Sequence, residues 1–128
     1  MIHRLIGFVL ALAIISVGCR GAFDVWIVQS ERGATNIYFN SRGLLGDSGV
    51  EIEQLQVGRI VADGKRVERV WSIRRRAKEL EPIKQITYGN VPQGFEEVLP
   101  ATALQPGENY DLLASFPGAI GGARFTKE

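Results

Sequence analysis

The chain has 128 residues, of which 45% are hydrophobic and 23% charged, the size and composition of one ordinary globular domain. Its 15 basic and 14 acidic residues nearly cancel, so composition gives no electrostatic reason to expect nucleic-acid binding. It contains a single cysteine, which excludes a disulfide within the chain.

The first residues have the order of a targeting segment. Leu5 to Val17 is an uncharged apolar run of 13 residues that follows the positive charge of Arg4. A helix that spans a bilayer needs about 20 such residues, so this run is short for a membrane span. A short apolar run between a basic start and small residues is typical of a signal peptide. The alternative is an uncleaved N-terminal anchor helix.

The segment "SVGC", Ser16 to Cys19, ends the apolar run and resembles the lipobox of bacterial lipoproteins. Ser16 departs from the commonest form of that motif, which has leucine there. The resemblance implies cleavage before Cys19 and acylation of its thiol, and hence attachment to the lipid bilayer of the cell membrane. The alternative is ordinary secretion, with cleavage near Gly18 or Gly21.

Cleavage at this point would divide the chain into three parts: a lipoprotein signal peptide at residues 1–18, a lipidated cysteine with a short tether at 19–22, and a folded domain at 23–128. Arg20 follows the cysteine, where aspartate would imply retention at the inner membrane of a Gram-negative cell. The resemblance therefore favours the periplasmic face of the outer membrane if the source is Gram-negative.

The mature part lacks the residues that most catalytic and metal sites need. The only histidine, His3, lies in the leader, and the only cysteine is the one expected to be lipidated. Ser-His-Asp and Cys-His catalysis require an imidazole, and typical zinc sites require histidine or cysteine. We therefore expect no catalytic residues, no cofactor and no metal ion. A hydrolase built on paired carboxylates is the less favoured alternative.

Turn signals rich in glycine, proline and asparagine separate short apolar and β-branched runs through the rest of the chain. This spacing predicts an all-β sandwich or barrel. A helical turn is conceivable in "RRRAKELE", Arg74 to Glu81. The expected strands are Phe23–Gln29, Thr35–Asn40, Val50–Ala62, Lys65–Arg75, Ile83–Tyr88, Tyr110–Phe116 and Ala123–Thr126.

Asp63-Gly64 predicts a hairpin, because this dipeptide favours a two-residue turn with positive φ between strands. One uninterrupted register through such a turn would pair Ile60 with Val67 and Val57 with Val70. It would also form three ion pairs between strands: Arg59 with Glu68, Glu53 with Arg74, and Glu51 with Arg76.

The same register assigns the side chains of the hairpin to two faces. Ile52, Ile60, Val67, Trp71 and Ile73 fall on one face, which we expect to be buried, with the indole of Trp71 above Gly58. Trp71 is therefore expected to be a structural core residue and not a ligand platform.

The stretch "LQPGENY", Leu104 to Tyr110, resembles the tyrosine corner of fibronectin type III and Ig-like domains. The resemblance implies an Ig-like or fibronectin type III-like β-sandwich, in which the Tyr110 hydroxyl bonds to backbone a few residues upstream. Tyr110 is then a structural residue. Leu112 and Ala114 would point inward with it, and Phe125 would do so from the last strand.

Loops on a rigid scaffold commonly carry function. The expected interaction surface is Asn90–Val98 together with Pro117–Gly122, with Phe95 as an exposed anchor beside Glu96 and Glu97, and with Ile120 in the second loop. The alternative for Phe95 is burial under its own loop. The sequence thus predicts a non-enzymatic interaction module with an envelope protein partner. A structural envelope lipoprotein without a defined ligand is the alternative.

Overall fold

The computed structural model describes residues 23–41, 49–61, 63–79, 81–116 and 119–128. The proposed leader and Cys19 lie outside these residues. The described residues form eight strands: β1 (Phe23–Gln29), β2 (Thr35–Ser41), β3 (Gln54–Val61), β4 (Arg66–Arg75), β5 (Gln85–Thr87), β6 (Phe95–Leu99), β7 (Asn109–Phe116) and β8 (Ala119–Thr126).

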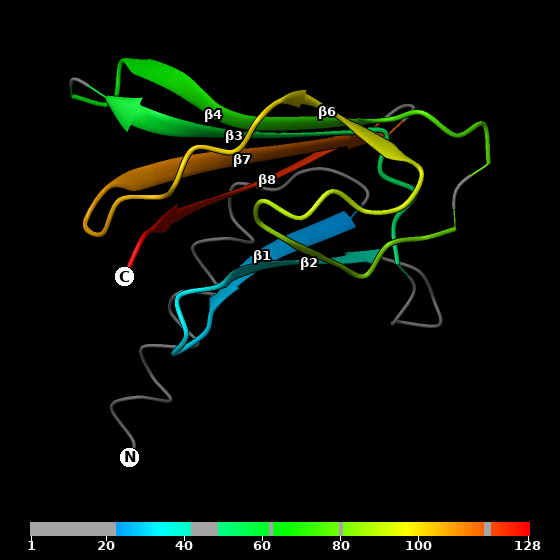
Figure 1. The fold of residues 1–128 in the computed structure, drawn as a ribbon, viewed down its shortest axis with the longest axis horizontal. Coiled ribbons are helices and arrows are strands. Elements are labelled where there is room, and N and C mark those ends of the chain that lie inside the picture. The colour runs from blue at the N-terminus through cyan, green and yellow to red at the C-terminus, as the bar shows by residue number, and fades with distance from the viewer. Residues whose placement is uncertain (1–22, 42–48, 62, 80, 117–118) are drawn as a thin grey trace.

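The strands form two antiparallel sheets that pack as a β-sandwich, so the predicted all-β fold is confirmed. One sheet has three strands in the order β1-β2-β5, and the other has five in the order β6-β4-β3-β7-β8. Figure 1 shows them as two layers, with β1 and β2 in the lower layer. The central placement of β3 and β7 beside the final β8 agrees with the arrangement of Ig-like sandwiches.

The core lies between the two sheets and is built by alternation along each strand. Phe23, Val25, Ile37 and Phe39 point inward from the smaller sheet and are at most 2% exposed. The larger sheet contributes fully buried side chains from three strands: Leu55, Val57, Trp71, Ile73, Leu112 and Ala114. Because successive residues of a strand point to opposite faces, these positions fix the inner face of each sheet.

The tyrosine corner has the geometry that the resemblance implies. The hydroxyl of Tyr110, a residue only 1% exposed, accepts a hydrogen bond from the backbone N–H of Gln105 at 2.7 Å. Its ring stacks on Phe125 from β8, with ring centroids 5.4 Å apart. Leu104 is partly buried against the core below the turn. The corner therefore joins the last two strands to the segment that enters β7.

The β3–β4 hairpin follows the expected register only near its tip. Arg59 lies opposite Glu68 and Ile60 opposite Val67, and the Arg59–Glu68 ion pair forms at 2.9 Å. A bulge between Val57 and Gly58 then shifts the pairing by one residue, so that Val57 faces Trp71 instead of Val70.

The shift makes three expectations from the uninterrupted register wrong. Arg74 pairs with Glu96 of β6 and not with Glu53. The described part of the chain likewise contains no Glu51–Arg76 ion pair. Val67 is 52% exposed, because the shift places it with Gly58 and Arg69 on the outward face of the sheet and not on the face of Trp71.

The bulge also relocates Trp71 relative to Gly58. Trp71 is fully buried in the core, but it is Val67 that occupies the space above Gly58. A Cβ atom added to Gly58 would lie 2.1 Å from Val67 Cγ1. The extra residue of β4 lets both Val70 and Trp71 be buried, which explains why strict alternation failed here.

Two further expectations about secondary structure were wrong. The helical turn at Arg74–Glu81 does not form in the described residues, since β4 continues through Arg75 and a bend follows. Strand β6 lies in the stretch from Tyr88 to Ala103, where we expected no strand, and it pairs with β4 at the edge of the larger sheet. The last strand also starts earlier than expected, at Ala119.

Candidate interaction groove

Two loops at one end of the sandwich enclose a groove of about 520 Å³. One loop runs from β4 towards β5 and the other enters β6 (Figure 1). The lining residues come from both loops: Ala77, Glu79, Glu81, Pro82, Ile83, Pro92, Gln93 and Gly94. The groove therefore contains part of the Asn90–Val98 surface expected from the sequence, and adds a wall that we did not expect.

The wall formed by the loop before β6 is held in place by backbone hydrogen bonds. The carbonyl of Gly94 accepts hydrogen bonds from the N–H groups of Arg76 at 2.8 Å and Ala77 at 3.1 Å. The carbonyl of Pro92 accepts one from Phe95 N–H at 3.1 Å, which closes a turn. Gly94 has φ of 87°, a conformation that glycine adopts without strain. These bonds tie the two loops together beside the groove.

The opposite wall is held against the segment before β3. Ile83 and Val50 exchange two backbone hydrogen bonds, at 2.8 and 2.9 Å. Gly49 makes this approach possible, because a Cβ atom there would lie 2.8 Å from the carbonyl carbon of Ile83. Both walls thus have fixed backbone positions, which lowers the entropy cost of binding a partner.

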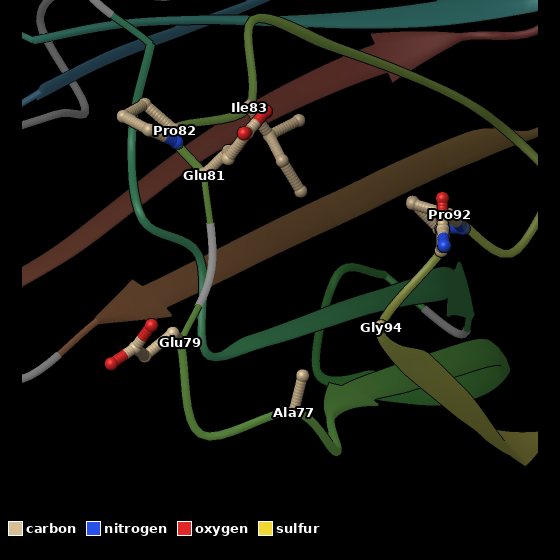
Figure 2. Close-up of a pocket in the computed structure, with 8 residues that line it drawn as sticks. Ala77, Glu79, Glu81, Pro82, Ile83, Pro92 and Gly94 are labelled. Atoms are coloured by element: carbon tan, nitrogen blue, oxygen red, sulfur yellow. The ribbon is translucent and has the colours of Figure 1, made fainter.

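The surface of the groove combines apolar and acidic groups. Figure 2 shows the Ile83 side chain pointing into the hollow from one wall, with Pro92 on the other, while the Glu79 carboxylate points away. Glu79, Glu81 and Gln93 are exposed. The arrangement offers apolar contact in the centre and hydrogen-bond acceptors at the rim, as in sites that bind polypeptide segments.

Phe95 is not the exposed anchor that we expected. It is 9% exposed and belongs to the core cluster, because it follows the Pro92–Phe95 turn and faces inward from the start of β6. The alternative, burial under its own loop, is closer to what the structure shows. Phe95 therefore supports the groove from beneath and contributes no surface to it.

Glu96 and Glu97 point in different directions and have different partners. The Glu96 carboxylate pairs with the guanidinium of Arg74 on the outer side of the sheet. The Glu97 carboxylate accepts a hydrogen bond from the indole Nε1–H of Trp71 at 3.0 Å. Their separation across the strand leaves no shared site in which the two carboxylates could act together as acid and base.

Ile120 is 62% exposed, but the structure does not bring it to the groove. It lies on β8, at the edge of the larger sheet opposite to β6. Four strand spacings separate these edges, roughly 19 Å. The second predicted loop is therefore a separate surface, and its residues Pro117 and Gly118 lie outside the described residues.

From the sequence we assigned no functional role to Glu81, Pro82 and Ile83, which form the second wall. Pro82 was the one sequence signal for a loop at this position, because proline restricts the residue before it and ends a helical segment.

In the described residues no helix is long and apolar enough to cross a bilayer, and no group of three metal-ligating side chains is present. No protein-family model matches the chain, and neither a curated protein nor a solved structure shows significant similarity to it.

Proposed function

We propose that the chain is a membrane-anchored bacterial lipoprotein whose β-sandwich is a non-enzymatic interaction module of the cell envelope. The anchor is Cys19, supported by the order of basic, apolar and small residues before it. The module binds a segment of an envelope protein partner in the groove lined by residues 77, 79, 81–83 and 92–94. The observation that carries this proposal is the groove itself, with both walls fixed by backbone hydrogen bonds.

The chemistry of the groove favours a segment with an apolar side chain beside a basic one. The apolar side chain would contact Ile83 and the two prolines, and a basic one would meet the exposed Glu81 at the rim. Charges at the rim set specificity and the rate of encounter more than affinity, so the apolar contact would supply most of the binding free energy.

Two measurements test the anchor. Mass spectrometry of the mature N-terminus is expected to find an acylated Cys19, and Cys19→Ser is expected to release the chain from the membrane fraction. An N-terminus that begins at another residue without lipid would contradict the anchor. This result would leave the groove untested, so the groove needs its own experiment.

The groove is tested by placing a photo-crosslinking amino acid at Gln93 in cells. A crosslinked partner is expected at this position and not at Lys65, which is exposed at the far tip of the β3–β4 hairpin. Ile83→Glu is expected to abolish the Gln93 crosslink while the domain stays folded by circular dichroism. Equal crosslinking at Gln93 and Lys65, or none at either, would contradict the proposal and favour a structural lipoprotein without a defined ligand.

A further inference from the structure

The outward face of the five-stranded sheet carries an unusual row of residues. The strand registers place Asp111, Gly58 and Arg69 side by side on β7, β3 and β4. Gly58 stands in the middle and contributes no side chain. The acidic and basic residues are therefore symmetric about β3, separated by two strand spacings, about 10 Å.

Exposed aliphatic side chains cross the same face. Val67 on β4, Leu113 on β7 and Ile120 on β8 are 52%, 47% and 62% exposed. In register these residues follow a diagonal line through Gly58. Ile60 pairs with Val67 on this face, so the line is more than the scattered exposed aliphatic residues of an ordinary surface.

A hollow of about 270 Å³ lies over the centre of this face. Its walls include Gln56, Val67, Arg69, Asp111 and Leu113, and Gly58 forms its floor. Gly58 contributes no side chain to the hollow, and the Val67 side chain packs over this glycine from one side. Val67 and Leu113 are its apolar walls, and Arg69 and Asp111 add one positive and one negative charge.

The two charges of the hollow are not paired with each other. Arg69 forms no ion pair with any described residue, and the nearest partner of Asp111 is Arg124, at 3.7 Å with a largely exposed guanidinium. An exposed pair at this distance contributes little to stability. Arg69 therefore has no ionic partner among the described residues, and Asp111 can exchange its weak contact with Arg124 for a positive charge from outside the chain.

A second copy of the same face supplies these charges in the required places. Consider two copies whose outward faces pack against each other, related by a two-fold axis that lies between them and runs parallel to β3. This rotation places the β7 side of one copy over the β4 side of the other. Asp111 of each copy then lies opposite Arg69 of the other, so two ion pairs form around the axis. Each arginine stem also covers the apolar wall of the facing hollow, as long cationic side chains commonly do.

We propose that this face is a two-fold interface between two copies of the chain, with reciprocal Arg69–Asp111 pairs across the axis along β3. Such an isologous contact closes on itself and forms a dimer and not a filament. The face lies on the five-stranded sheet, away from the end loops that form the groove. The proposed function and this interface therefore do not depend on each other.

The test is sedimentation equilibrium of the full chain in detergent, with single charge reversals and their mixture. The wild type is expected to form dimers, and Arg69→Asp or Asp111→Arg alone to raise the dissociation constant at least about tenfold, because each places like charges opposite one another. A one-to-one mixture of the two variants is expected to regain wild-type affinity as a heterodimer, since every facing pair is again of opposite sign.

Lys65→Asp is the matched control, a charge reversal at an exposed position at the hairpin tip that should leave the dissociation constant unchanged. Melting temperatures of all variants show that each is folded. A wild-type chain that stays monomeric up to about 100 μM overturns the proposal. So does a dimer that Arg69→Asp leaves unaffected, or a mixture of variants no tighter than either alone, which would point to a different partner or face.

Discussion

The hydroxyl of Tyr110 can be removed without changing anything else at the corner. Tyr110→Phe keeps the ring and its stack on Phe125 but deletes the acceptor of the Gln105 N–H hydrogen bond, which is 2.7 Å long. A hydrogen bond of this kind contributes about 1 kcal/mol, and leaving a partly buried donor unpaired raises the cost to about 1–2 kcal/mol. For a domain of about 100 residues this corresponds to a melting temperature lower by roughly 4–10 °C.

Thermal unfolding followed by circular dichroism measures this change, and Tyr38→Phe is the control. Tyr38 also stacks on an aromatic ring, that of Trp26, with centroids 5.6 Å apart. Its hydroxyl forms no hydrogen bond with the described residues, so its removal should leave the melting temperature unchanged. If Tyr110→Phe melted with the wild type, or if both variants lost the same stability, the structural role assigned to the corner would be refuted.

Four further variants, of which Glu96→Ala is a control, test the core and its edges. Glu97→Ala should destabilise the domain by about 1–2 kcal/mol in urea unfolding, because the buried indole N–H of Trp71 loses its acceptor. Glu96→Ala loses only an exposed ion pair with Arg74 and should cost under about 1 kcal/mol. Gly121→Ala should cost about 1–3 kcal/mol in the same assay, since its Cβ would lie 2.4 Å from the buried ring of Phe23, and a wild-type midpoint would contradict this packing. Burial raises the pKa of Tyr88 to about 12, above the value of about 10 in an unfolded chain, so the folded state retains this proton longer. Stability should therefore fall between pH 10 and pH 12, and Tyr88→Phe should remove part of that slope; an unchanged slope would refute the assignment.

The sequence predicted most strands because their alternation depends on neighbours within the same strand. β1 was predicted with its observed bounds, and β2, β4 and β7 to within one residue at either end. The tyrosine corner was recognisable because its turn and its tyrosine lie within seven residues. Local patterns of this kind are complete in a short stretch of chain.

What the sequence did not predict depends on contacts between distant segments. The bulge beside Gly58 allows both Val70 and Trp71 to be buried in the core. No local sequence pattern indicates such an inserted residue. β6 was missed because its partners on β4 lie at least 20 residues earlier in the chain, and because prolines on both sides of it are unfavourable in a strand. Only one wall of the groove was predicted, for the same reason. The two walls are distant in sequence and are brought together by the hydrogen bonds that the Gly94 carbonyl accepts from the other loop.

The bulge in the β3–β4 hairpin divides it into two parts that can change length independently. Beyond Gly58 the β4 side of the hairpin is exposed and the β3 side is half-buried, and the pairs follow one register up to Val61 and Arg66. Adding or deleting one residue in each strand there would move the tip along the sheet and leave the core positions of Val57 and Trp71 unchanged. The same change on the core side of the bulge would turn Trp71 towards solvent. Variation in length among related chains should therefore concentrate at this tip, and an inserted tag or loop is best placed there.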